Sequence, residues 1–290
     1  MSAKMNDLSV TALYTSAAWS WGRLPNADLF DHRDARRVFA VVNAVLGIAR
    51  PFIGLRTALP IALLHRHTLI DALLRTSGAE QVLELAAGLS RRGVTFTADP
   101  RIAYFEIDYP EVIATKRALL ERTAYGRSAV RRTNFHLAGA DVLTASLDAL
   151  CPPSSGALFV IAEGLVMYLD ADAQRTLGRS VASRLAASGG TFVFDFVPPG
   201  ELPPPGPVGR GLDWAMRRWT GGKGFARDER SREQVVADLL ACGFDTASAI
   251  EPHDVAHAWG LPYPDAATQQ LVFVAHVHPP SHNHPSRGRS

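Results

Sequence analysis

Residues 81–88 read Q-V-L-E-L-A-A-G, a short apolar run that ends in three small residues. The run is too short for a helix and lies between Gly78 and Gly88, so it predicts a buried parallel strand. The side chains of Ala86, Ala87 and Gly88 are minimal, which lets the backbone turn tightly and approach a ligand. This stretch therefore predicts the first strand and the ligand-binding turn of an α/β fold.

A second predicted strand, at 101–107, leads into Asp108, which lies 20 residues beyond Gly88. In doubly wound sheets, an acid about 20 residues past the glycine turn accepts hydrogen bonds from the ribose hydroxyls of a nucleotide. The strand, the turn and the acid at the end of the next strand together indicate a cofactor that contains adenosine.

The turn differs from one that binds a dinucleotide. A pyrophosphate site needs the spacing G-x-G-x-x-G, whereas this turn continues as A-A-G-L-S-R-R-G. S-adenosylmethionine contains adenosine without phosphate and carries a positive charge on its sulfur. The carboxylate of Glu84 suits such a cation, although a helix-capping or surface role for Glu84 stays open.

The composition is that of one large folded unit. The chain has 290 residues of which 47% are hydrophobic, enough for one sizeable core. The net charge of +2 gives no electrostatic case for nucleic-acid binding, and the arginine pairs at 91–92, 131–132 and 217–218 are interpreted as solvated surface. Cys151 and Cys242 have no disulfide-framework or metal-ligand spacing, so we expect no metal and a reducing, cytoplasmic setting.

No membrane span is expected. Residues 38–49 are apolar apart from Asn43, but these are 12 residues where a span needs about 20. The first 13 residues lack the basic segment and the apolar core of a signal peptide. Residues 38–49 are therefore assigned to a core or cap helix.

Beyond residue 81, strands alternate with helices, which predicts a mostly parallel, doubly wound sheet. Residues 1–77 have helical periodicity and predict an N-terminal helical cap on a Rossmann-like core at 78–278. A Pro- and Gly-rich segment predicts a lid inserted after the fifth strand at 198–230, and the polar tail at 279–290 predicts disorder. Further strands are expected at 134–137, 157–162, 191–196 and 270–276, and helices at 110–124, 170–187 and 231–242.

Several longer strings of residues point to a family. They include Q-V-L-E-L-A-A-G-L-S-R-R at 81–92, Y-F-E-I-D-Y-P-E-V-I-A-T-K at 104–116, G-A-D-V at 139–142 and I-A-E-G-L-V-M-Y-L at 161–169. With R-H-T-L-I-D at 66–71, they resemble the leucine carboxyl methyltransferase superfamily, in particular its bacterial branch of polyketide-type O-methyltransferases.

The resemblance implies a class I methyltransferase fold with S-adenosyl-L-methionine as cofactor and a small molecule as substrate. Asp108 would hold the ribose hydroxyls, as the spacing also indicates. Asp141 and the backbone of Val142 would contact the adenine. Glu163 would line the site just below the reacting centre, and Arg66 would pair with the cofactor carboxylate.

In such a family the turn at 86–88 would lie against the methionine part of the cofactor, and its sequence departs from the usual pattern. The family's turn is usually G-A-G followed by L-D-T-R, whereas this chain has A-A-G followed by L-S-R-R. Ala86 adds a Cβ where backbone and ligand come close, and Ser90 replaces an acid.

Methyl transfer from a sulfonium is an in-line displacement, so the protein's main task is to position the nucleophile. A carboxylate acceptor is already ionised and needs no base, whereas a hydroxyl needs one. No catalytic residue is assigned. Tyr168 is a candidate for substrate contact but can equally pack under the lid. His253 and His257 are candidate bases, although a lone histidine is more often structural.

Three functions remain open from the sequence. The first is an O-methyltransferase acting on a carboxylate or hydroxyl of a small molecule, such as a polyketide-like metabolite. The second is a non-catalytic or weakened homologue that keeps the cofactor-binding fold, and the third is an NAD(P)-dependent oxidoreductase, which the missing glycine pattern disfavours. The identity of the acceptor and the oligomeric state are left open.

Overall fold

Strand β1 (Gln81–Leu85) is buried along its whole length, as a continuous apolar run requires. It lies between β2 (Ala103–Asp108) and β4 (Leu158–Ala162) and is parallel to both, so it forms the centre of the sheet. Leu85 pairs with Ile107, and therefore β1 and β2 end nearly level with each other.

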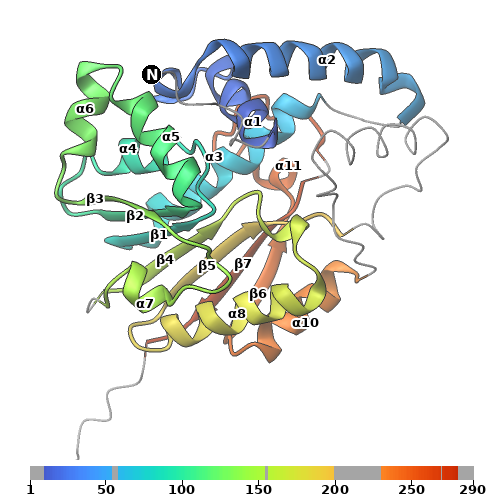
Figure 1. Ribbon diagram of the computed structural model, residues 1–290. Helices are drawn as coiled ribbons and strands as arrows, with labels where there is room; N and C mark the ends of the chain where they lie inside the picture. Colours follow the sequence, from blue (N-terminus) through green and yellow to red (C-terminus); the bar gives the residue numbers. More distant parts are fainter. Residues whose placement is uncertain (1–9, 54–57, 154–155, 199–229, 269, 280–290) are drawn as a thin grey trace, which may run out of the picture.

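The computed structural model describes residues 10–53, 58–153, 156–198, 230–268 and 270–279. Within them, seven strands form one sheet in the order β3-β2-β1-β4-β5-β7-β6 (Figure 1). Neighbouring strands are parallel except at β7, which runs antiparallel to β5 and to β6. The other strands are β3 (Phe135–Gly139), β5 (Gly190–Asp195), β6 (Thr246–Ile250) and β7 (Val272–Val277). No bounds were predicted for β6; the predicted bounds of the other six strands are confirmed to within two residues.

Helices cover both faces of the sheet, as the alternating pattern predicts (Figure 1). On one side lie α1 (Val10–Trp21), η2 (Ala27–Phe30), α2 (Arg33–Ile53), α3 (Leu59–Ser77), α4 (Arg92–Phe96), α5 (Pro110–Leu120), α6 (Ala124–Val130) and α11 (Pro252–Val255). On the other side lie α7 (Leu147–Leu150), α8 (Ala171–Leu185) and α10 (Arg232–Ala241). A short helix, η3 (Val166–Tyr168), follows β4.

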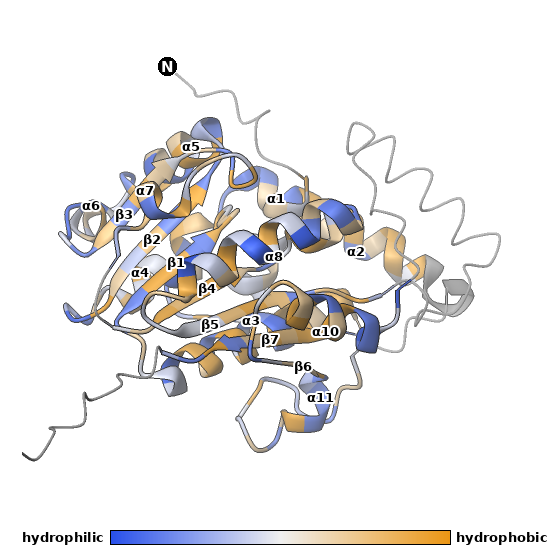
Figure 2. Ribbon diagram, turned by 90° about the horizontal axis from the view of Figure 1, so that it is seen from below, coloured by the Kyte–Doolittle hydropathy of each residue, from blue (hydrophilic) through white to orange (hydrophobic). Residues whose placement is uncertain are grey.

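Successive strand residues point to opposite faces, which divides the core in two. Val82 belongs to the cluster under α1 and α3, whereas its neighbour Leu83 belongs to the cluster under α8 and α10. Figure 2 shows hydrophobic residues along the central strands, with hydrophilic and hydrophobic residues mixed along α8. The helices before β1 share a core with the sheet, since Leu13 of α1 and Leu69 of α3 lie in the same cluster as Val82.

Side-chain caps set the starts of the later helices. Asp170, the first residue of the helix predicted at 170–187, caps α8 by accepting a hydrogen bond from the backbone N–H of Ala173 at 2.8 Å. Ser231 forms a reciprocal capping box with Gln234 at the start of α10. These local signals explain why both predicted helices are confirmed close to their expected first residues.

The single helix predicted at 110–124 is wrong, because the chain forms two helices there. Thr123 caps the second helix by accepting a hydrogen bond from the N–H of Gly126 at 2.9 Å. A Cβ on Gly126 would lie 2.0 Å from the carbonyl oxygen of Leu120, so only glycine permits this close turn between α5 and α6.

Two other predicted segments lie almost entirely outside the described residues. The predicted lid at 198–230, apart from its two end residues, and the predicted tail at 279–290, apart from its first residue, lie outside them. Among the helices that are described, none has the length and apolar character to cross a membrane.

A buried ion pair connects α5 to β2 beneath η2. Lys116 and Glu106 have no exposed surface and form an ion pair, and the Lys116 ammonium lies 5.5 Å from the centre of the Phe30 ring. The Gly93 N–H also donates to Glu106 at 3.1 Å. Burial raises the pKa of Glu106 from 4.5 to about 7, against the opposing effect of Lys116.

We therefore expect Glu106 to make the free energy of unfolding depend on pH. A raised carboxyl pKa stabilises the fold fully below the unfolded value of 4.5, and this contribution is lost as pH rises through about 7. Its size is at most about 3 kcal/mol, at about 1.4 kcal/mol per pKa unit. Urea unfolding at pH 5 and pH 8 should show a smaller pH difference for Glu106→Gln than for wild type. Equal pH differences would contradict this assignment, whatever the absolute stabilities.

Candidate functional site

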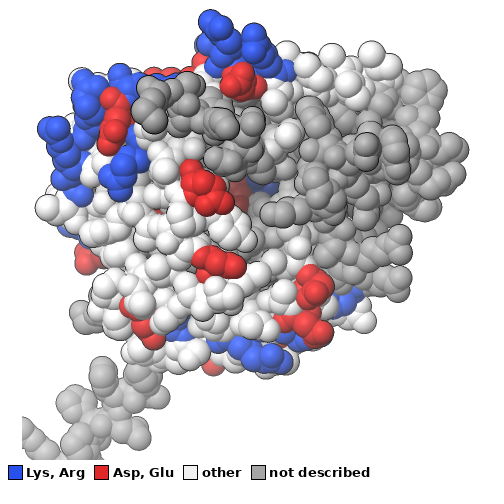
Figure 3. Space-filling view, viewed as in Figure 1, with Lys and Arg blue, Asp and Glu red and all other residues white. Residues whose placement is uncertain are grey.

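Acidic residues at the ends of neighbouring strands meet at one edge of the sheet. Asp108 ends β2, Glu163 follows β4 and Asp195 ends β5, next to the turn that follows β1. This carboxyl edge is where open α/β sheets bind ligands. In Figure 3, separate acidic side chains lie across the middle of the visible face of the molecule, while most basic side chains lie toward the top of the picture.

The turn after β1 has an unusual backbone for its residues. Ala86 has φ +51° and Gly88 has φ +49°, both in the left-handed region. The Ala87 N–H donates to the carbonyl of Ile107 at 3.0 Å, which fixes the turn against β2. Because a left-handed alanine costs roughly 1–2 kcal/mol, the departure at position 86 strains the turn.

Asp108 lies beside this turn, as the spacing of 20 residues predicts. Its carboxylate accepts hydrogen bonds from the backbone N–H groups of Gly88 and Tyr109, both at 2.7 Å. The residue is 8% exposed, and burial raises the pKa of its carboxyl group although both hydrogen bonds lower it. The acid thus holds the turn in place at the edge of the crevice.

Asp141 and Val142 follow β3 on the far side of Asp108. The N–H of Ala140 donates to the Asp108 carbonyl at 2.8 Å, so the 139–142 segment continues the edge formed by β2. Burial and then the carboxylates of Asp141 and Asp108 raise the pKa of the Tyr109 phenol, which lies near both. The structure therefore brings the predicted nucleoside-binding residues together along β1, β2 and β3.

Beneath the crevice, Arg92 joins three elements through its guanidinium. Its Nε donates to Asp71 of α3 at 2.7 Å, and its Nη1 donates to Glu84 of β1 at 2.9 Å and to Glu163 at 2.6 Å. Its Nη2 donates to the carbonyl of His67 at 3.0 Å. Arg92 has no exposed surface, so all of these are charge-assisted contacts in a dry setting.

The interpretation of Arg91 and Arg92 as solvated surface is wrong. They are 1% and 0% exposed, and Arg91 also forms an ion pair with Asp71. Their counter-charges come from elements distant in sequence, which a local charge pattern does not reveal. Of the other pairs, Arg131 is exposed and Arg132 half-buried, while residues 217–218 lie outside the described part of the chain.

Glu84 is part of this network and not a surface or capping carboxylate. It is 2% exposed, and its second oxygen accepts a hydrogen bond from the Tyr104 hydroxyl at 2.7 Å. Both of its oxygens are therefore bound by protein groups. Direct contact of Glu84 with a cofactor stays a prediction.

Glu163 is the best-connected carboxylate at the carboxyl edge. Its Oε1 accepts from Arg66 at 2.8 Å, and its Oε2 accepts from Arg92 at 2.6 Å and contacts His67 Nδ1 at 2.8 Å. Burial raises the pKa of Glu163, but Arg92, His67 and Arg66 outweigh it and hold that pKa well below its usual range. Arg66 also donates to Asp195, the last residue of β5, at 2.6 Å.

The candidates for catalysis lie in different settings. The hydroxyl of Tyr168 lies 3.1 Å from the Thr11 hydroxyl of α1. The turn at Gly88 also faces α1, because a Cβ on Gly88 would lie 3.8 Å from the Cβ of Ala12. The start of α1 therefore lies between the turn after β1 and the short helix η3 that follows β4. His257 pairs with Asp265 at 3.0 Å on the surface, with 72% of its side chain exposed.

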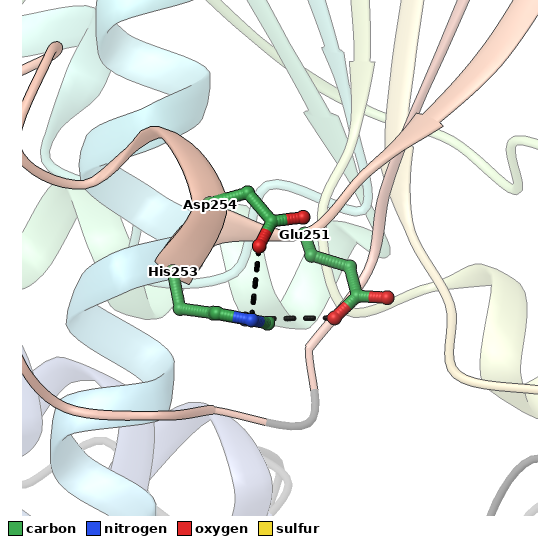
Figure 4. A group of neighbouring side chains, drawn as sticks. All are labelled: Glu251, His253 and Asp254. Carbon is green, nitrogen blue, oxygen red and sulfur yellow. Dashed lines mark ion pairs between the residues drawn. The ribbon is translucent and has the colours of Figure 1, made fainter.

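His253 belongs to an ion-pair cluster at the end of β6, drawn in Figure 4. Its Nδ1 lies 3.5 Å from Glu251, whereas its Nε2 lies 3.0 Å from Asp254. One ligand atom from each of these three side chains lies within 4.8 Å of the other two, a spacing that can hold a metal ion. Glu251 is also paired with Arg232 at 2.6 Å.

Comparison with known proteins bears on most of the site. The family model described as Leucine carboxyl methyltransferase matches residues 52–182, so the family resemblance is confirmed over that segment. A "Putative S-adenosyl-L-methionine-dependent methyltransferase" of Mycolicibacterium gilvum is 37% identical over 126 residues, and one of Mycobacterium marinum is 34% identical over 122. Each alignment covers 42% of this chain but only 39% and 40% of those relatives.

Solved structures support the fold over nearly the whole chain. A "putative methyltransferase" from Thermobifida fusca gives a TM-score of 0.60 at 17% identity and covers 93% of this chain and 96% of that one. A "putative O-methyltransferase" from Nostoc punctiforme gives a TM-score of 0.51 at 16% identity, over 92% of this chain and 69% of that one. The predicted Rossmann-like, class I methyltransferase fold is confirmed.

The strained turn gives a first prediction for this site. Ala86→Gly should raise the free energy of unfolding by about 0.5–1 kcal/mol, because relief of the left-handed strain exceeds the entropy cost of glycine. Ala87→Gly is the matched control, since φ at Ala87 is not positive, and it should lower stability. Urea unfolding of the two variants checks this. A loss of stability in both would show that position 86 is unstrained.

The buried guanidinium gives a second prediction. Arg92→Met should cost about 3–5 kcal/mol, because it leaves the carboxylates of Asp71, Glu84 and Glu163 without their shared partner. Arg101→Gln is the control, because Arg101 is 76% exposed in its pair with Asp99 and such pairs contribute about 0–1 kcal/mol. Chemical unfolding of both variants measures the difference, and equal losses would argue against a central role for Arg92.

Proposed function

We propose that this chain is an S-adenosylmethionine-dependent O-methyltransferase that acts on a carboxylate or a hydroxyl of a small molecule, such as a polyketide-like metabolite. The matched relatives are named S-adenosyl-L-methionine-dependent methyltransferases, without an acceptor, and the chain spans about two fifths of their length.

The observation that carries the proposal is an excess of buried carboxylates at the carboxyl edge. Three buried guanidiniums and four buried carboxylates are connected, and the buried groups sum to a formal charge of −1: Arg66, Arg91 and Arg92 with Asp71, Glu84, Glu163 and Asp195. A fourth guanidinium, that of the exposed Arg75, lies 3.8 Å from Asp71, where water screens its charge. Burial and the nearby Arg92 lower the pKa of His67, so its imidazole is neutral at pH 7 and does not reverse this balance. Such surroundings favour a cationic ligand and disfavour a pyrophosphate.

We assign the cofactor contacts along β1, β2 and β3. The turn at 86–88 would lie against the methionine part, Asp108 would accept from the ribose hydroxyls, and Asp141 with the Val142 backbone would hold the adenine. The carboxylate of Asp108 has lone pairs beyond those used by Gly88 and Tyr109, so both roles are compatible.

When bound, S-adenosylmethionine would supply a methyl group on a positively charged sulfur, open to in-line displacement by an oxygen nucleophile. The chain's own task is to orient the acceptor and to keep negative charge near the cation. Glu163 follows β4, and the neighbouring guanidinium of Arg92 holds the pKa of its carboxyl group well below the usual range, which suits the second task. A carboxylate acceptor would need no base, and a hydroxyl acceptor would need one, for which Tyr168, His253 and His257 remain the candidates.

The alternative of a weakened or non-catalytic homologue rests on the turn. Ala86 occupies a left-handed position, and Ser90, 2% exposed, replaces the acid that is usual in the family pattern the chain resembles. If these changes abolish cofactor binding, the fold would persist without the activity.

Isothermal titration tests the cofactor. We expect saturable binding of S-adenosylmethionine and none of NAD(H), with binding abolished in Asp108→Ala and weakened at least tenfold in Asp108→Asn. Glu111→Ala, which removes an exposed acid nearby on α5, is the control and should bind like wild type. Thermal unfolding establishes that each variant is folded. A folded wild type that does not bind S-adenosylmethionine would overturn the proposal.

A further inference from the structure

A histidine and two carboxylates meet where the chain leaves β6 (Figure 4). Glu251 follows β6 directly, and His253 and Asp254 lie in the short helix α11. The last residues of β6 and β5 both pair with Val272 of β7, so the two strands end level with each other. The three side chains therefore stand at the carboxyl edge of the sheet, beyond β5 and away from the cofactor contacts proposed along β1, β2 and β3.

The contact between His253 and Glu251 has the spacing of two metal ligands. Nδ1 of His253 lies 3.5 Å from Oε2 of Glu251. Two ligand atoms that each lie about 2.1 Å from a tetrahedral ion are about 3.4 Å apart. The Nδ1 atom is buried and has no hydrogen-bond partner among the described residues, although 36% of the His253 side chain is exposed. An ion between the two atoms would satisfy this nitrogen.

Asp254 supplies a third ligand. One ligand atom from each of the three side chains lies within 4.8 Å of the other two. Asp254 now lies 3.0 Å from the other ring nitrogen of His253, Nε2, so this carboxylate would have to turn toward the ion. Its side chain is 65% exposed, which permits the turn and gives an ion a path from solvent. Three protein ligands would leave a fourth position for water or another oxygen.

The carboxylate of Glu251 is oriented by a contact of its own. Arg232 pairs through Nη1 with Oε1 of Glu251 at 2.6 Å, and the other oxygen, Oε2, is the one that lies near His253. Ligand carboxylates are held by outer groups in this way. Pro252, which separates the two ligands in the chain, is buried and has a fixed φ. Two of the three ligands are thus held near their positions before an ion binds.

We propose that Glu251, His253 and Asp254 form a binding site for a divalent transition-metal ion such as Zn²⁺. One imidazole with two carboxylates suits Zn²⁺ better than Ca²⁺ or Mg²⁺, whose usual ligands are all oxygens. The expectation of no metal rested on the spacing of the two cysteines, which take no part here. The site does not depend on the proposed methyl transfer. An ion on Nδ1 would, however, remove His253 from the candidate bases.

Isothermal titration of the full chain with zinc chloride, after treatment with a chelator, tests the site. We expect wild type to bind Zn²⁺ at a site that is weakened at least tenfold in His253→Gln and in Glu251→Gln. His257→Gln is the matched control for metal binding and should leave this site unchanged, because His257 pairs with the single carboxylate of Asp265. Equal affinity in wild type and His253→Gln would overturn the proposal and assign any binding to other histidines.

Cobalt gives a second readout that requires no activity. Four-coordinate Co²⁺ absorbs visible light much more strongly than hydrated Co²⁺ does. We expect the strong absorption in wild type and in His257→Gln, and its loss in His253→Gln and in Asp254→Asn. Thermal unfolding without metal establishes that each variant is folded. Absorption that persists in His253→Gln, or that is missing in wild type, would sink the assignment of the three ligands.

Discussion

The buried guanidinium of Arg92 is the contact on which the crevice depends. A charge with no exposed surface has to be matched by protein groups, and Arg92 finds them 21, 8 and 71 residues away, in Asp71, Glu84 and Glu163. These partners come from the cap helix α3, the central strand β1 and the turn after β4. Because all three share one rigid, planar group, they cannot shift independently of one another.

The two halves of the crevice are held by different kinds of interaction. On the side of β2, backbone N–H groups donate to Asp108 and bind the turn after β1 to the neighbouring strand. On the side of β4 and β5, the charged side chain of Arg66 in α3 donates to both Glu163 and Asp195. The N-terminal helices are therefore part of the site's wall, in addition to packing in the same core as the sheet.

The sequence predicted those features that depend on neighbouring residues. The apolar run of β1, the cap at Asp170 and the place of Asp108 beside Gly88 all follow from short-range pattern and spacing. It failed where a residue's setting depends on distant partners. In the sequence, Arg91 and Arg92 resemble surface residues because the carboxylates that pair with them, in α3 and after β4, are distant along the chain. The break after α5 likewise depends on the close approach of Gly126 to Leu120. The contact of Arg66 with Asp195, 129 residues on, left no local signal.

The place of β7 has a consequence for how the sheet is completed during synthesis. β7 lies between β5 and β6, although it is the last of the described strands to be made. β6 pairs with β7 alone, so its backbone groups have no strand to bind until the residues at 272–277 have left the ribosome. The first five strands can associate in order as they emerge, whereas this edge of the sheet has to wait. Until then, the backbone groups of β5 that will pair with β7 form an open edge of the sheet. A chaperone that shields such edges would act at this stage.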